Sequence, residues 1–183
     1  MKAINAKLFI QGYYAGNETM KPVANNQDSS QPTTDVEVVT ATLYDNQGNE
    51  VEVSSGMLKT DGTVSFDFNS TGTFWLGVRG KNSLLLFAKP QITLDETDVD
   101  YDFTAQEENQ AEVAFGVYAA FSGDINGDGA IDGDDESLLQ AAIDAFANGV
   151  QPADLNGDGG VDNSDMDFLA ANAGRTVAFP TGF

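Results

Sequence analysis

The sequence predicts a mostly β fold: an antiparallel β-sandwich followed by a small α-helical module. Two observations predict this division. From residue 1 to about 121, short runs alternate apolar and polar residues. At residue 122 this period of two is replaced by two loops rich in Asp, Asn and Gly, each followed by a helical period. Because 183 residues are enough for two modest domains, we predict a sandwich over 1–121 and a module over 122–183.

The strand pattern returns at close spacing, and turn signals such as Asp61-Gly62 and Gly80-Lys81-Asn82 separate the runs. Short strands of this kind, without a helical period, are typical of an antiparallel sandwich. The polar stretch 16–34 is predicted to be a long exposed loop. The last residues, which include Val177 and Phe179, are expected to pack back as a short strand. The alternating runs lie at residues 4–10, 39–43, 64–68, 74–78, 84–88, 99–103 and 113–117.

The composition excludes several classes of function. The chain has no cysteine and no histidine, so thiolate metal sites, Ser–His–Asp catalysis and Cys–His catalysis are excluded. It carries 29 acidic and 8 basic residues, a net charge of −21, which disfavours binding to nucleic acid and to anionic membranes. No run approaches the roughly 18 apolar residues that span a bilayer, so membrane insertion is not expected. Such an acidic chain favours cations as partners.

Two twelve-residue loops, 124–135 and 154–165, repeat one pattern at an interval of 30 residues. Both carry oxygen-bearing side chains at positions 1, 3, 5, 9 and 12, glycine at position 6, and a residue at position 7 that offers its backbone carbonyl. Ordinary Asp–Gly turns of an acidic protein are the alternative reading, but two tandem copies favour a binding site. The candidate ligands are Asp124, Asn126, Asp128, Ala130, Asp132 and Asp135, and then Asp154, Asn156, Asp158, Gly160, Asp162 and Asp165.

This pattern predicts two calcium ions. Calcium takes six to eight oxygens, and a twelve-residue loop with glycine at its sharp turn supplies them, whereas magnesium demands a stricter octahedron. The module 123–183 holds twelve acidic residues and one basic residue, so we expect calcium to drive its folding. Ile131 and Val161, at position 8, are expected to point inward and to pair the two loops as a β-bridge.

A helical segment is predicted after each loop. Leu139, Ile143 and Phe146 form an apolar stripe after the first loop. Met166 begins the corresponding apolar set after the second loop, and Gly174 is a suitable residue to end that helix.

Loop–helix repeats without an entering helix resemble the dockerin family, over residues 122–174. The resemblance implies a docking role outside the cell, with a cohesin-like domain of a scaffold protein as partner. The recognition positions carry small or acidic residues, such as Gly133-Asp134, so a neighbouring subunit of the same protein is the alternative partner. The whole chain looks like the C-terminal β-sandwich-plus-dockerin region of large secreted bacterial proteins, through the segments 8–14, 78–83, 101–104 and 116–126.

These observations together predict a non-catalytic, calcium-binding module for docking, adhesion or assembly, located outside the cell or at its surface. One alternative is a structural subunit of a calcium-stabilised surface filament or layer, in which the N-terminal strand pairs between copies. Another is a carbohydrate-binding sandwich, with Tyr13, Tyr14, Trp75 and Phe87 as its aromatic platform. No pair of carboxylates stands out as a catalytic pair, so an enzyme is not expected.

Overall fold

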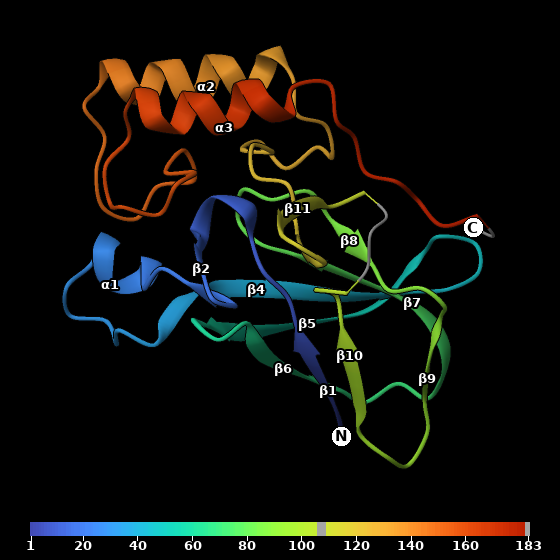
Figure 1. The fold of residues 1–183 in the computed structure, drawn as a ribbon. Coiled ribbons are helices and arrows are strands. Elements are labelled where there is room, and N and C mark those ends of the chain that lie inside the picture. The colour runs from blue at the N-terminus through green and yellow to red at the C-terminus, as the bar shows by residue number, and fades with distance from the viewer. Residues whose placement is uncertain (106–108, 182–183) are drawn as a thin grey trace.

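The computed structural model describes residues 1–105 and 109–181. Its strands precede its two longer helices, which lie side by side at one end of the molecule, opposite the N-terminus (Figure 1). The strands are β1 (Lys2–Lys7), β2 (Tyr14–Gly16), β3 (Thr19–Met20), β4 (Asp35–Tyr44), β5 (Glu50–Lys59), β6 (Thr63–Phe68), β7 (Gly72–Arg79), β8 (Leu86–Phe87), β9 (Ile92–Leu94), β10 (Val99–Asp102), β11 (Ala111–Ala114) and β12 (Val117–Ala119). The helices are the 3-10 turn Gln11–Tyr13, α1 (Val23–Gln27), α2 (Gly133–Asp144) and α3 (Asn163–Asn172).

Two main sheets build the β part. The larger sheet has the order β5-β4-β7-β8, with β9 also paired to β7, and the smaller sheet has the order β10-β1-β6. Strand pairing is antiparallel except between β1 and β10. The prediction of a mostly β chain with antiparallel sheets is confirmed. None of the helices in the described residues is both long and apolar enough to cross a bilayer.

Strand β1 is hydrogen-bonded along both edges, to β6 on one side and to β10 on the other. An added strand needs an edge with unpaired N–H and C=O groups. The N-terminal strand therefore has no edge left for pairing with a second copy. That part of the filament alternative is wrong.

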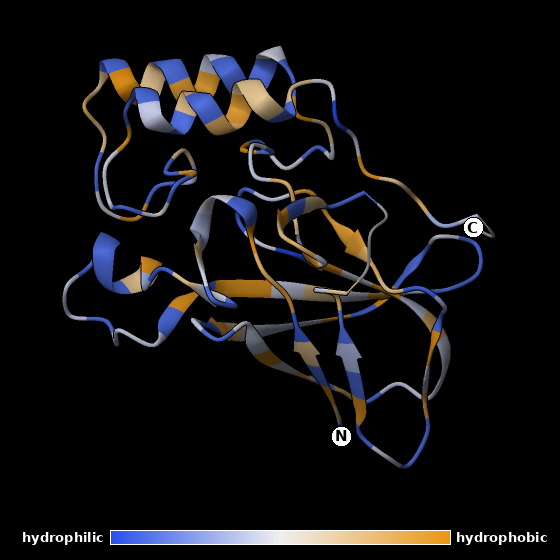
Figure 2. Ribbon diagram, in the orientation of Figure 1, coloured by the Kyte–Doolittle hydropathy of each residue, from blue (hydrophilic) through white to orange (hydrophobic). Residues whose placement is uncertain are grey.

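The alternation seen in the sequence places one face of each main strand in the core. In β6, Val64, Phe66 and Phe68 are buried while the residues between them are exposed. Figure 2 shows hydrophobic bands along β4, which contributes Val39 and Leu43 to the same core. Strand β5 is not among the predicted runs, and its alternating valines face outward rather than into the core. The predicted run at 113–117 is divided between β11 and β12.

The stretch 16–34 is not a continuous exposed loop. It contains the end of the β2–β3 hairpin and helix α1, and Met20 and Val23 are buried. The prediction was wrong because the polar side chains of this stretch find partners in the C-terminal part of the chain, which no local pattern reveals. Asn26, for example, donates a hydrogen bond to the carbonyl oxygen of Gly157 at 2.7 Å.

Two hydrophobic clusters lie along the chain. The larger one belongs to the sheets, and the smaller one contains Ile131, Leu139, Leu155 and Leu169 from the loops and helices. Leu84 belongs to the smaller cluster although it precedes residue 122. The boundary between 121 and 122 stays a prediction, and apolar contacts cross it.

The side chain of Glu52 stabilises the turn between β6 and β7. Its carboxylate accepts hydrogen bonds from the backbone N–H groups of Asn69 at 3.0 Å and Ser70 at 2.9 Å. Hydrogen bonds from Ser70 and Asn69 lower the pKa of Glu52 to about 2. Because the pKa in the folded chain lies below the ordinary value of 4.5, this carboxylate stabilises the fold above that value. The stabilisation is lost as the pH falls through about 2.

We therefore expect Glu52→Gln to lower the urea midpoint at pH 7, and we expect the difference from wild type to shrink as the pH approaches 2. Comparing the two proteins at each pH isolates Glu52 from the other carboxylates, since their effects are common to both. Glu50→Gln, an exposed change on the same strand, serves as the control and should leave the midpoint nearly unchanged. A pH-independent difference for Glu52→Gln would contradict the assignment.

Candidate metal site

The two loops fold alike around the carboxylate at position 12. In the first loop, Asp135 accepts hydrogen bonds from the backbone N–H groups of Ile125 at 2.7 Å, Asn126 at 3.1 Å and Asp132 at 3.0 Å. The second loop repeats these three bonds at 2.7–2.9 Å, with Asp165 as the acceptor. Both carboxylates are fully buried. The repeat in the sequence is therefore a repeat in geometry.

Positions 9 and 12 also start the helices. Asp132 is the N-cap of α2 and accepts from the N–H of Asp134, and Asp132 and Asp135 together form a capping box. Asp162 and Asp165 form the same box at the start of α3. Such caps satisfy N–H groups that have no partner within the helix. This explains why a helix begins directly after each loop.

The carboxylate at position 1 turns inward in both loops. Asp124 and Asp154 are buried, and Oδ1 of each accepts a hydrogen bond from the glycine N–H at position 4 at 2.8 Å. The glycines at position 6, Gly129 and Gly159, have φ angles of +90° and +93°. This is the left-handed region that other residues avoid, so the requirement for glycine at the sharp turn is met.

Positions 1 and 12 form a buried acidic pair in each loop. Burial raises the pKa of Asp124, and the carboxylate of Asp135 raises it further. Burial likewise raises the pKa of Asp165, and Asp154 adds to that rise. A carboxylate that accepts two or three hydrogen bonds still has free lone pairs, and buried carboxylates held together favour a cation. The residues at positions 1 and 12 therefore fit a bound calcium ion.

The other predicted ligands lie closer to the rim of each loop. Asn156 is buried, whereas the side chains at positions 5 and 9 of both loops are exposed. Position 5 bonds within the loop, since Asp128 accepts from the N–H of Ala130 at 2.9 Å, and position 9 caps the helix. Across residues 1–105 and 109–181, no group of three or more His, Cys, Asp or Glu side chains is placed to hold a metal ion. The two calcium ions stay a prediction.

The loops pair with the chain after the opposite helix rather than with each other. Ile131 donates from its N–H to the carbonyl oxygen of Arg175 at 2.9 Å, and Val161 donates to that of Ala147 at 3.0 Å. The expected bridge between Ile131 and Val161 is therefore replaced by bridges from Ala130 to Thr176 and from Gly160 to Asn148. The reason is that α2 and α3 are antiparallel neighbours, so each helix ends beside the other helix's loop (Figure 1). The tail packs back at Thr176 through an isolated bridge, but among the described residues it does not form the short strand that was expected.

Part of the predicted helical stripe points outward. Leu139 is buried, as expected, but Phe146 is 86% exposed. Helix α2 ends at Asp144, and Phe146 takes a φ of +52°, which turns its ring away from the core. A bulky residue with a positive φ is strained. The surrounding structure, rather than the local preference of phenylalanine, therefore fixes this backbone conformation.

Sequence reasoning missed five side chains of residues 1–121 that donate hydrogen bonds to the loops. Arg79 lies beside the first loop, and the second loop is contacted by Lys21, Asn26, Gln27 and Asn82. They are far from the loops in the sequence and share no local motif. The one available signal was that basic residues are scarce, since the chain has only 8 of them.

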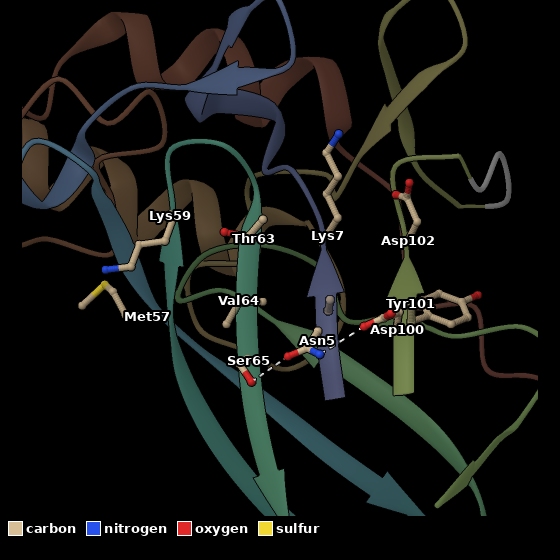
Figure 3. Close-up of a pocket in the computed structure, with 11 residues that line it drawn as sticks. Asn5, Lys7, Met57, Lys59, Thr63, Val64, Ser65, Asp100, Tyr101 and Asp102 are labelled. Carbon is tan, nitrogen blue, oxygen red and sulfur yellow. Dashed lines mark hydrogen bonds between the residues drawn. The ribbon is translucent and has the colours of Figure 1, made fainter. Parts of the chain in front are cut away.

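A cleft of about 690 Å³ lies away from the loops, on the open side of β10, β1 and β6 (Figure 3). Asn5 donates a hydrogen bond to Asp100 at 3.0 Å and accepts one from the hydroxyl of Ser65 at 3.0 Å (Figure 3). The lining residue Tyr101 has its ring 4.6 Å from that of Phe103, and its hydroxyl contacts the backbone of Lys89. The cleft is lined by both apolar side chains, such as Met57 and Val64, and polar side chains that already have hydrogen-bond partners, such as Asn5 and Tyr101.

Two of the four aromatic residues expected to form a carbohydrate platform are buried. Tyr13 and Phe87 are buried, and Tyr13 takes part in hydrogen bonds with Asn82 and Glu37. Burial raises the pKa of the Tyr13 hydroxyl well above its ordinary value of 10.0. Buried rings have no face to offer to a sugar, so the carbohydrate-binding alternative loses two of its four proposed residues, whereas Tyr14 and Trp75 are half-buried.

Comparison with known proteins identifies a shared fold. Two solved structures resemble the chain, and both are described as type II Cohesin–X-Dockerin complexes from Acetivibrio cellulolyticus carrying interface mutations. The TM-scores are 0.58 and 0.57 at 16% and 14% identity, and each match covers 96% of this chain and 97% of the other. This likeness shows the fold alone. No family model matches the chain, and no curated protein matches it.

The comparison corrects the family assignment drawn from the loops. The likeness runs over the whole, mostly β chain, whereas the dockerin resemblance rested on residues 122–174. No family model supports that segment. The assignment to the dockerin family, and to a sandwich-plus-dockerin region of secreted proteins, therefore does not stand. The supported description is a β-sandwich fold of the kind found in type II cohesin complexes.

Proposed function

We propose that this chain is a non-catalytic, extracellular protein-docking module whose loops 124–135 and 154–165 each bind one calcium ion. The observation that carries the calcium sites is the buried carboxylate pair formed by positions 1 and 12 in both loops. Docking is supported by the fold, because the similar structures come from protein–protein complexes. Partners of the cohesin–dockerin kind follow from that likeness, and a neighbouring subunit of the same protein is the alternative that the loop residues suggest.

Calcium would be held mainly by the buried carboxylates, with backbone carbonyls at position 7 and the rim side chains completing the shell. Burial is the main cause of the raised pKa values of Asp124 and Asp165, and repulsion between positions 1 and 12 adds to it; a positive charge between them would offset both effects. Because the same carboxylates organise the loop backbone and cap the helices, calcium would stabilise α2 and α3 through them.

The docking surface that we propose lies on and just after α2. Leu138, Phe146 and Val150 are 46%, 86% and 68% exposed. All three lie on or within six residues of the end of α2, and large exposed apolar side chains favour a protein partner. The left-handed backbone of Phe146 costs on the order of 1–3 kcal/mol, and it keeps this ring outside the core.

Calorimetric titration of the full chain with calcium tests the metal sites, and uptake of two ions is the expected result. An absence of heat and of any change in melting temperature at millimolar calcium would overturn this part. Extracellular calcium sites can have dissociation constants as high as about 10⁻³ M, so the calcium concentration in the titration must reach that value.

Phe146→Glu is expected to weaken docking at least about tenfold, because it places a charge in an apolar contact. Binding would be measured against immobilised type II cohesin and, separately, against a dockerin, each with calcium and with chelator. Phe115→Glu is the matched control, since Phe115 is fully exposed on the turn between β11 and β12 and does not belong to α2 or the chain that follows it. Equal losses for the two variants would show that the apolar residues near α2 are not the docking surface.

A further inference from the structure

Side chains of the sandwich contact three equivalent oxygen atoms in each loop. These are the backbone carbonyl and the Oδ2 atom of position 1, and the backbone carbonyl of position 4. In the first loop they belong to Asp124 and Gly127, and in the second to Asp154 and Gly157. The two sets of oxygens correspond position by position, but the groups that bind them differ in charge.

One guanidinium group makes these contacts in the first loop. Arg79, the last residue of β7, donates to the carbonyl oxygens of Asp124 at 3.3 Å and Gly127 at 3.2 Å. Its Nη2 lies 3.5 Å from Oδ2 of Asp124, which makes an ion pair. A further bond from Nε to the carbonyl oxygen of Ser83 at 3.2 Å fixes the side chain. A permanent positive charge therefore faces a predicted calcium ligand.

Three neutral side-chain amides make the equivalent contacts in the second loop. Asn82 donates to the carbonyl oxygen of Asp154 at 3.2 Å, Gln27 donates to Oδ2 of Asp154 at 2.7 Å, and Asn26 donates to the carbonyl oxygen of Gly157 at 2.7 Å. These contacts organise the loop without placing a charge on the ligand carboxylate.

Two lysines also lie near the second loop. Lys21 donates to the backbone carbonyl of Asn156 at 2.7 Å rather than to a carboxylate. Lys81 bonds to the far end of Gln27 at 2.8 Å, and its charge is paired with Glu37 at 3.6 Å. The contrast therefore concerns the carboxylate at position 1, which has a cation beside it only in the first loop among the described residues.

The first loop is also the more open of the two. It borders a cavity of about 540 Å³ that Arg79, Asp124 and Asp128 help to line. Asn126 is exposed, whereas its counterpart Asn156 is buried. Solvent therefore reaches the first loop more readily than the second.

We propose that the sandwich makes the two calcium sites unequal: Arg79 turns the first loop into a weak, readily exchanging site, while the neutral amides leave the second loop a tight one. This inference rests on the proposed calcium binding. Two like charges about 5 Å apart repel strongly even at an effective dielectric constant of about 20. Solvent and the neighbouring carboxylates offset much of that repulsion, and a difference of about tenfold or more in affinity is expected to remain.

The inequality matters for docking because the weak site leads directly into α2. Asp132 of the first loop is the N-cap of the helix that carries Leu138 and precedes Phe146. At calcium concentrations that fill only the tight site, the second loop and α3 would be ordered first. The docking surface would then respond to calcium over the range that fills the first loop.

Calorimetric titration of the full chain tests this, with calcium alone as the probe. Wild type is expected to bind two ions with affinities at least about tenfold apart. Asp124→Ala should remove the weak step and Asp154→Ala the tight one. The amide signals of Gly129 and Gly159, followed by NMR, report independently which loop fills first.

Arg79→Gln is the decisive variant, because it removes the charge but keeps an amide that can donate as Gln27 does. It should raise the affinity of the first loop about tenfold and leave the second unchanged. Arg79→Lys keeps the charge and should keep the weak site weak. Lys2→Gln, which makes the same charge change beside Ser70 and far from the loops, should alter neither site.

The outcomes separate the two proposals. If no calcium binds to wild type, the proposed function itself fails. If two ions bind with equal affinity, or if Arg79→Gln weakens the first loop, then calcium binding stands and the role assigned to Arg79 is overturned. Circular dichroism with calcium confirms that each variant is folded before its affinities are compared.

Discussion

Replacing Asp165 with alanine is expected to destabilise the protein by about 3–5 kcal/mol in saturating calcium, the range for breaking a buried charged network. This fully buried carboxylate accepts hydrogen bonds from the N–H groups of Leu155, Asn156 and Asp162. Without it, three inward-facing N–H groups lose their partner, α3 loses its capping box, and the proposed second calcium site loses one of its candidate ligands. Chemical unfolding with calcium measures the loss.

The same variant measured with chelator should lose less stability. Asp154 and Asp165 repel each other when no cation lies between them, and this repulsion contributes to the raised pKa of Asp165. Removing one carboxylate relieves that repulsion and offsets part of the lost hydrogen bonding. Asp167→Ala is the control, because it makes the same charge change at an exposed position of the same helix. If both variants behaved alike, Asp165 would not be the organising group of the second loop.

Gly12→Ala is expected to separate the sandwich from the second loop. A Cβ at Gly12 would overlap the backbone carbonyl oxygen of Leu155, and the N–H of Gly12 donates to the hydroxyl of Ser122 at 3.1 Å. Backbone lies on both sides of this contact, so no side-chain rotation makes room. The cost should reach or exceed the upper end of the roughly 1–3 kcal/mol typical of overpacking. Denaturant unfolding and protease cleavage between residues 145 and 155 measure the effect.

The matched control is Gly133→Ala at the start of α2. No atom lies within 4 Å of a Cβ at Gly133, and its φ is not in the left-handed region. Alanine favours a helix over glycine by up to about 1 kcal/mol, so this variant should be unchanged or slightly more stable. Similar stabilities for the two variants would show that Gly12 and Leu155 are not in close contact.

Local periodicity was sufficient where one face of a strand is buried and the other is solvated. Val64, Phe66 and Phe68 in β6 illustrate this. The approach failed for β5, where Val51 and Val53 face outward at 45% and 54% exposure. It also failed for residues 16–34, because the polar side chains around α1 are satisfied by a loop more than 120 residues away, as the bond from Gln27 to Asp154 shows.

The sequence by itself determined the two loops, because the candidate ligands, the glycines at position 6 and the helix caps all lie within twelve consecutive residues and depend on local geometry. It also determined that the chain is mostly β. Only the tertiary structure decided that each loop pairs with the chain after the opposite helix, and that Arg79 faces one loop while amides face the other. These contacts join segments that are far apart in the sequence, and the packing of the loops on the sandwich, rather than any local pattern, selects them.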